Sequence, residues 1–236
     1  MFRRADFVRL LAALTLAGAA HASDFAPTPF QATYSTTLNG VPLGIELHLD
    51  LKNAGADTWE LGLSANSLLM HYLETSRFRW HDCSADPQRY RFEFRGFGVN
   101  RKLQLDFNHD QHIAAGESRR GPVSFTFTPD ATDELALTYA ARCQLLQGAT
   151  QVTFNVATTT GMKQLTYRID GHELLKTPYG KLDTVRIIRV REQGDKRRTL
   201  LWVAPALDYI MVKLEHVEKL GVRGTVVLKS LEGITP

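Results

Sequence analysis

The sequence predicts a mainly β protein: one large curved antiparallel sheet, a half-barrel or open barrel, with one covering α-helix near residues 133–146. Three observations support this. Apolar and polar residues alternate along most of the chain, as in strands with one buried face. The connecting segments are short, which favours antiparallel neighbours over parallel crossovers. One segment breaks this period with apolar residues at helical spacing. With 236 residues, 44% of them apolar, the chain can bury one substantial core, so we expect a single β-rich domain over 23–236.

The first 22 residues have the three parts of a secretory signal peptide. Three arginines precede an apolar run from Leu10 to Ala20, and Ala20-His21-Ala22 then offers small residues to a signal peptidase. The run is too short to span a bilayer of roughly 30 Å. We therefore expect cleavage after Ala22 and a periplasmic mature protein; a buried N-terminal helix is the alternative. No later segment approaches the length of a membrane span, so no transmembrane segment is expected after cleavage.

Removing this segment also changes the charge of the protein. The formal net charge falls from +3 to +1, because three arginines and one aspartate leave with it. The remaining basic groups, Arg119-Arg120 and Lys196-Arg197-Arg198, lie beside turn-forming residues and indicate solvated loops. Binding to nucleic acid needs a concentrated positive face, so no nucleic-acid partner is predicted.

The N-terminal strands are predicted to form an antiparallel meander. A strand at 30–38 ends in Asn39-Gly40, a dipeptide suited to the positive φ angles of a tight hairpin turn. Strict alternation then predicts strands at 45–51 and 59–65. Further strands are predicted around Phe78 and Trp80 and at 89–95, 102–108, 111–115, 125–127, 152–156, 165–169, 182–190, 198–203, 209–216 and 222–230.

The segment that breaks the period is predicted to be a helix from Asp133 to Leu146. Its apolar residues at helical spacing are Leu135, Tyr139, Cys143 and Leu146. Asp130 or Thr132 can cap its start, and Gly148 can end it. A second, shorter helix is a candidate at 67–72. A lone helix in a β chain must cover apolar surface, and the concave face of a curved sheet is the expected place.

Cys83 and Cys143 are the two cysteines. In an oxidising compartment this pair can close, and a bridge around about sixty residues would stabilise the fold by roughly 4 kcal/mol. Two separate buried thiols are the alternative, because geometry decides and the sequence does not give it.

The motifs of common enzymes are absent from the sequence. No Gly-x-Ser-x-Gly nucleophile turn occurs. His172-Glu173-Leu174-Leu175-Lys176 departs from a zinc-protease helix at Lys176, and the segment has the pattern of a strand. The pair His109 and His112 falls at a hairpin tip, where the side chains point in different directions. No catalytic residue, cofactor or metal site is therefore predicted.

Aromatic residues give the strongest candidate for a binding surface. They form a broad apolar wall, for which two interpretations remain open. The wall is either ordinary core beneath the helix or, because one helix cannot cover so many strands, part of a cavity for an acyl chain or other apolar ligand. The candidate ligand-binding residues are Phe78, Trp80, Tyr90, Phe92, Phe94 and Tyr139.

Three segments of the C-terminal half resemble a known family. They are Lys176 to Val185 with its Thr-Pro-Tyr-Gly turn, Leu200 to Pro205 with its Leu-Trp pair, and Val212 to Glu215. The chain resembles the bacterial exported family catalogued as domain of unknown function 3108. The resemblance implies an envelope location and a mainly β fold, and it brings no established activity. Pro178 and Gly180 suit a turn, and Trp202 is a large plate whose indole N–H needs a partner.

We expect a non-enzymatic periplasmic protein that binds an apolar or lipid-like ligand in its curved sheet. The alternative is an envelope protein-interaction or assembly module without a cavity, and a third hypothesis is a hydrolase that uses dispersed residues. The first two differ in one structural respect: the concavity is either open or filled by the helix near 135–146.

Overall fold

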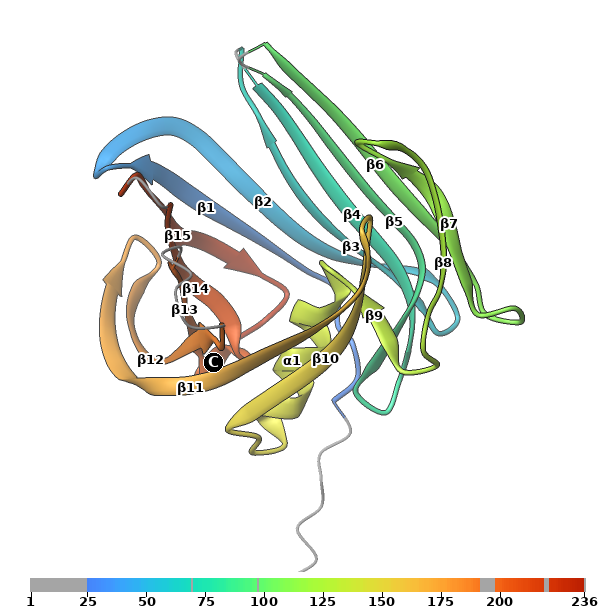
Figure 1. Ribbon diagram of the computed structural model, residues 1–236. Helices are drawn as coiled ribbons and strands as arrows, with labels where there is room; N and C mark the ends of the chain where they lie inside the picture. The colour runs from blue at the N-terminus through green and yellow to red at the C-terminus, as the bar shows by residue number, and fades with distance from the viewer. Residues whose placement is uncertain (1–24, 69, 97, 192–197, 219–220, 236) are drawn as a thin grey trace, which may run out of the picture.

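The computed structural model describes residues 25–68, 70–96, 98–191, 198–218 and 221–235, and the predicted signal peptide lies outside them. Fifteen strands in this part of the chain form one sheet. The same part of the chain contains helix α1 (Ala136–Leu146) and the 3-10 turn η1 (Pro205–Leu207) (Figure 1). The strands are β1 (Phe30–Leu38), β2 (Val41–Gly55), β3 (Thr58–Asn66), β4 (Met70–His81), β5 (Ser84–Gly96), β6 (Val99–Asn108), β7 (Ile113–Ser118), β8 (Gly121–Thr126), β9 (Ala131–Asp133), β10 (Gln151–Thr158), β11 (Gly161–Thr177), β12 (Gly180–Arg189), β13 (Arg198–Ala204), β14 (Ile210–Val217) and β15 (Arg223–Glu232).

The sheet consists of two runs of hairpins joined in the middle. Its order is β8 to β1 on one side, followed by β15 down to β9 on the other. The join is the antiparallel pairing of β1 with β15, in which Gln31 lies opposite Glu232. Asn39, at the tip of the first hairpin, strengthens this join because its backbone N–H donates to the carbonyl of Arg223 at 2.7 Å. The predicted turn at Asn39-Gly40 is confirmed by φ angles of 48° and 82°.

The sheet curves until its β9 end approaches the opposite arm. Strand β9 is hydrogen-bonded to β10 and packs against β5. The hydroxyl of Ser76 in β4 also donates to the Asp133 carboxylate of β9. Figure 1 shows α1 on the concave side, between the two arms. The predicted curved sheet with one covering helix is therefore confirmed.

The β9–β10 pair is parallel, which makes this edge an exception to the predicted antiparallel sheet. The reason lies in the connection, because α1 separates the two strands in the chain. A crossover that contains a helix returns the chain in the same direction, as parallel strands require.

Helix α1 begins close to the predicted position but uses a different cap. Asp133 Oδ1 accepts hydrogen bonds from the backbone N–H groups of Leu135 and Ala136, at 2.9 and 2.8 Å. The expectation that Asp130 or Thr132 caps the start is therefore wrong. At the other end, Gly148 has a φ of 89°, a left-handed conformation that suits glycine after a helix, as predicted.

The short helix expected at 67–72 is wrong. Met70 already belongs to β4, and Leu69 lies outside the described residues. Two hydrogen bonds close a hairpin here instead: the backbone N–H of Ser67 donates to the Met70 carbonyl, and the N–H of Met70 donates to Ser67 Oγ. The pairing of β3 with β4 then extends to the hairpin end, because tertiary pairing outweighs the local helical preference of a few residues.

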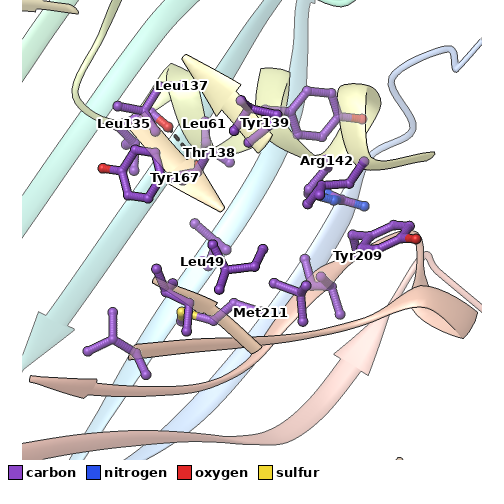
Figure 2. A pocket seen from close by; sticks show the side chains of 18 of the residues that line it. Leu49, Leu61, Leu135, Leu137, Thr138, Tyr139, Arg142, Tyr167, Tyr209 and Met211 are labelled. Atoms are coloured by element: carbon purple, nitrogen blue, oxygen red, sulfur yellow. Dashed lines mark hydrogen bonds between the residues drawn. The ribbon is translucent and has the colours of Figure 1, made fainter. Parts of the chain in front are cut away.

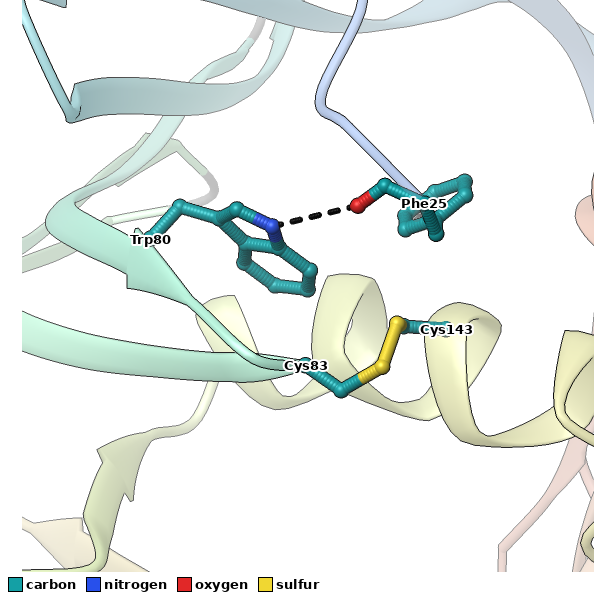
Figure 3. Close-up of a disulfide and its surroundings, with 4 residues drawn as sticks. All are labelled: Phe25, Trp80, Cys83 and Cys143. Atoms are coloured by element: carbon teal, nitrogen blue, oxygen red, sulfur yellow. Dashed lines mark hydrogen bonds between the residues drawn. A yellow bond between two sulfur atoms is a disulfide. The ribbon is translucent and has the colours of Figure 1, made fainter. Parts of the chain in front are cut away.

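A disulfide joins Cys83 to Cys143, and their Cα atoms are 5.4 Å apart, within the usual range for such bonds. Cys83 lies in the turn between β4 and β5, and Cys143 lies in α1. The bond therefore fastens the helix to the β4–β5 arm (Figure 3). Nearby, Trp80 Nε1 donates to the carbonyl of Phe25 at 3.3 Å. The disulfide interpretation of the two cysteines is confirmed.

Within the described residues, no helix has the length and apolar composition needed to cross a membrane.

Candidate ligand-binding site

A cavity of about 250 Å³ lies between α1 and the concave face of the sheet. Its walls come from β1, β2 and β3 on one side, α1 on another, and β10 to β15 opposite (Figure 2). The residues that line it are Phe30, Leu47, Leu49, Leu61, Leu63, Leu135, Leu137, Thr138, Tyr139, Ala141, Arg142, Leu145, Thr150, Gln151, Val152, Tyr167, Arg168, Ile169, Ile187, Leu201, Val203, Tyr209, Ile210, Met211, Leu214 and Val226.

Strand alternation explains the aliphatic wall of this cavity. Leu49 lies opposite Leu63 in the β2–β3 ladder, and Leu47 lies two residues before Leu49 on the same face. His48, between these two leucines, is exposed on the other face. The helix covers part of the concave surface and leaves these leucines facing empty space.

The exposed lining residues indicate where the cavity meets solvent. They are Thr138, Thr150, Gln151 and Arg168. Arg168 forms an ion pair with Asp170 at 3.4 Å. Two of these residues, Gln151 and Arg168, lie opposite each other in the β10–β11 ladder.

One charged residue of the wall, Arg142 of α1, is buried, with 7% of its surface exposed. Figure 2 shows it projecting from the helix between Tyr139 and Tyr209. Its Nε donates to the backbone carbonyl of Asp208 at 2.8 Å. Its Nη1 is buried and has no hydrogen-bond acceptor among the described residues. Burial lowers the pKa of Arg142, an effect that Tyr139 and Asp208 oppose.

Three aromatic rings surround this guanidinium. Its Cζ lies 4.9 Å from the ring centre of Tyr139, 5.1 Å from that of Phe30 and 5.7 Å from that of Phe25. Cation–π attraction stabilises a charge in such a place without neutralising it.

The chain segment that faces Arg142 has an unusual backbone. Asp208 and Tyr209 have φ angles of 50° and 56°, in the left-handed region that non-glycine residues rarely adopt. This conformation follows η1, presents the Asp208 carbonyl to Arg142 and places the Tyr209 ring in the cavity wall. Backbone strain of this kind costs roughly 1–3 kcal/mol per residue and is often found at ligand sites.

Of the six predicted binding residues, Tyr139 lines the cavity, and the other five lie outside its lining. Phe78 is fully buried and, with Trp80, packs against Tyr139, with ring centres 6.2 and 5.1 Å from it. The helix thus rests on this aromatic wall. Sequence reasoning missed the aliphatic wall, because alternation predicts which residues face inward but not which of them the helix covers.

The other three predicted residues belong to β5, beside a group of polar side chains. Tyr90 is buried, and its hydroxyl donates to Glu74 at 2.7 Å. The ring of Phe92 meets that of Tyr72 edge to face, with centres 5.5 Å apart. Phe94 is half-buried at the position opposite Tyr72 in β4.

Several acids lie near these aromatic residues. Glu74 also accepts from Tyr72 at 2.5 Å. Burial raises the pKa of the fully buried Asp133 to about 7, although hydrogen bonds from Ala136 and Ser76 oppose the rise. Glu134 is exposed to solvent, yet protein groups surround it; desolvation, followed by repulsion from Glu74, raises its pKa as well. Asp133 and Glu134 therefore hold their protons more tightly than ordinary carboxyl groups do.

The rejected motifs have structural roles. His109 Nε2 lies 2.7 Å from the Pro87 carbonyl, and the rings of His109 and His112 both pack against Phe127. Glu173 lies in β11, as its strand pattern predicts, and accepts from the indole N–H of the buried Trp202 at 2.7 Å. No group of three or more His, Cys, Asp and Glu side chains in the described part of the chain could hold a metal ion.

Comparison with known proteins supports the fold and assigns no reaction. Residues 24–228 match the model of the family described as Protein of unknown function (DUF3108). No curated protein matches the chain.

The chain also matches solved structures, and the degree of likeness differs among them. The crystal structure of a beta-barrel-like protein of domain of unknown function DUF1849 from Brucella abortus superposes with a TM-score of 0.59, covering 88% of this chain and 98% of that chain at 9% identity. A DUF1329 family protein from Desulfovibrio piger covers 88% of this chain and 86% of its own at 11% identity, with a TM-score of 0.31. The first supports a barrel-like fold, and the second is too dissimilar to add to it.

Proposed function

Starting from the fact that this chain belongs to the DUF3108 family of proteins of unknown function, we propose that it is a non-enzymatic periplasmic protein that binds an apolar or lipid-like molecule. The observation that carries the proposal is the cavity between α1 and the sheet, with its aliphatic walls. Apolar pockets with few polar groups are typical of binding sites. In this proposal Tyr139 contacts the ligand, and the aromatic wall beneath it positions the helix.

The cavity favours a carrier over an interaction module without a cavity. If α1 filled the concave side, the apolar strand faces would simply be core. Instead, Leu47, Leu49 and Leu63 are only partly buried although they lie on the inner face. The solvent-accessible stretch near Thr150 and Gln151 would give a ligand a way in.

The experiment is native mass spectrometry of protein exported from cells and purified gently. We expect a small molecule to remain bound to the wild type. In Leu49→Trp the indole would occupy the cavity, and the bound fraction should fall by at least tenfold. The matched control is His48→Trp, which places the same side chain one residue away on the exposed face and should retain the molecule.

Several results would count against this proposal. A wild type without any bound molecule that also fails to take up added alkyl-chain compounds would remove the carrier function. Retention by Leu49→Trp would show that the molecule binds elsewhere. Hydrolysis of generic ester, peptide or glycoside substrates above background would favour the enzyme hypothesis instead.

Export needs its own test. Cell fractionation together with the intact mass of the mature protein should place it in the periplasm with Ser23 as its first residue. A cytoplasmic protein that retains its first 22 residues would contradict the proposed location.

A further inference from the structure

The cavity contains a buried positive charge that the described chain does not neutralise. Arg142 is 7% exposed and forms no ion pair with a described carboxylate. The side chain of Asp208 is exposed; its charge favours the charged form of Arg142, but the direct contact between the two residues is the hydrogen bond to the Asp208 backbone carbonyl. An isolated charge in an apolar setting is costly unless it is paired and hydrogen-bonded. In proteins, replacing a buried charged group by an apolar residue of similar size is often neutral or stabilising.

The surroundings of Arg142 leave part of its hydrogen-bonding capacity unused. The rings of Phe25, Phe30 and Tyr139 lie near the guanidinium, and the carbonyl of Asp208 occupies Nε alone. Nη1 is left without an acceptor among the described residues. A guanidinium held in this way presents parallel N–H groups, which suit the two oxygens of a carboxylate or a phosphate.

We infer that Arg142 is an anion-binding residue and that the occupant of the cavity is a single-chain amphiphile with a carboxylate or phosphate headgroup. This inference rests on the proposed function, because it identifies the class of ligand that the apolar cavity holds. The headgroup would accept hydrogen bonds from Arg142, and the chain would lie against leucines such as Leu49 and Leu61.

The size of the cavity limits the chain. At about 250 Å³, the cavity lies near the lower end of the roughly 300–1,000 Å³ that is typical of small-molecule pockets. A volume of this size favours a ligand with one alkyl chain over a ligand with two.

A second cation in the wall provides a comparison within the same cavity. Arg168 also lines it, but it is exposed and already paired with Asp170. Because solvent screens an exposed pair, Arg168 should contribute little to the affinity for an anion. The inference therefore distinguishes two arginines of one cavity by their burial.

The test is calorimetric titration of the delipidated, disulfide-bonded protein at pH 7.5 with decanoate, decyl phosphate and decanol. The three probes share a chain and differ in headgroup. Wild type should bind at least one of the anions tenfold to a hundredfold more tightly than decanol, as roughly expected for charge-assisted hydrogen bonds. Decanoate and decyl phosphate then separate a carboxylate ligand from a phosphate ligand.

Variants of the two arginines show which residue is responsible for the preference for anions over decanol. In Arg142→Met the affinity for the preferred anion should fall to that for decanol, while decanol binds about as in wild type. Arg168→Met is the matched control and should keep the preference. Arg142→Lys keeps the charge but loses the parallel N–H groups of the guanidinium, so it should show an intermediate preference. It also provides a second variant if Arg142→Met does not fold.

The outcomes separate this inference from the proposed function. If decanol binds wild type as tightly as the anions, or if Arg142→Met keeps the preference, the anion site is refuted while the apolar carrier stands. Loss of the preference for anions in Arg168→Met would show that Arg168, and not Arg142, binds the headgroup. If none of the three probes binds, both the carrier and the anion site fail.

Discussion

Replacing Asp133 by asparagine should alter how the stability of the fold depends on pH. Asp133 is fully buried, accepts two backbone N–H groups at the start of α1 and accepts the hydroxyl of Ser76. An asparagine can keep this geometry, since its Oδ1 accepts the two N–H groups and its Nδ2 can donate to Ser76 Oγ. The substitution therefore removes a titrating group with little change in packing.

The magnitude follows from the pKa of the carboxyl, which burial raises from 3.8 to about 7 in the folded protein. Since the folded state holds this proton more tightly than the unfolded chain, the contribution to stability is fully present below pH 4. It is lost as the pH rises toward 7. A difference of about three units corresponds to up to about 4 kcal/mol, at roughly 1.4 kcal/mol per unit.

The assay is urea denaturation of wild type and Asp133→Asn between pH 4 and pH 8, followed by tryptophan fluorescence. The free energy of unfolding of the variant, minus that of wild type, should increase with pH by up to about 4 kcal/mol. Taking this difference cancels the surface acids whose pKa is lowered, such as Glu46 and Glu93, because both proteins contain them.

Asp130→Asn is the control. Asp130 is exposed, and hydrogen bonds from the side chains of Thr128 and Asn155 lower its pKa. The stability that it contributes is therefore lost as the pH falls. Its difference curve should be small and slope the other way. A flat or falling curve for Asp133→Asn would refute the reasoning, since it would mean that hydrogen bonding to the carboxylate outweighs its burial.

Three further predictions concern stability. Replacing both Cys83 and Cys143 with serine should lower the free energy of unfolding by roughly 2–4 kcal/mol in a urea titration, and an unchanged midpoint would show that α1 docks without the bond. Gly116→Ala should lower the thermal midpoint strongly, because an added Cβ would lie 2.1 Å from the backbone carbonyl oxygen of Gln104; a variant as stable as wild type would contradict the close β6–β7 contact. Tyr34→Phe removes a buried hydroxyl that has no partner in the described chain and should raise the free energy of unfolding by about 1 kcal/mol; a loss of similar size in chemical denaturation would reveal a hydrogen bond to that hydroxyl.

Much of the fold could be predicted because strand and helix periods are local. The alternation around Leu49 predicts an inward face whatever its partners are, and the spacing of Leu135 and Tyr139 predicts a helix face. The pairing of β1 with β15 could not be predicted, because Gln31 and Glu232 carry no pattern that selects one another. Such long-range choices depend on the packing of the whole sheet.

The site was harder to predict than the fold. Tyr139 is both a predicted binding residue and a residue of the observed cavity wall. It was predictable because a large side chain on the helix that covers the sheet lies close to the border of the uncovered surface. Arg142 falls among the apolar residues of that helix, and the sequence alone does not say that it turns inward. A basic residue within an apolar helical segment was the available signal.

The pairing of β1 with β15 also bears on how this protein is made. Among the described strands, the last in chain order, β15, closes the sheet beside the first, β1. While the chain is being made from its N-terminus, the hairpin run from β1 to β8 is therefore complete when one edge of β1 is still unpaired. That border is a template for aggregation until β15 arrives. Folding in the cell should thus depend on chaperones that cover the unpaired edge of β1 in the incomplete chain. Once the C-terminal segment is free to pair with β1, the protein should no longer be prone to aggregate through this edge.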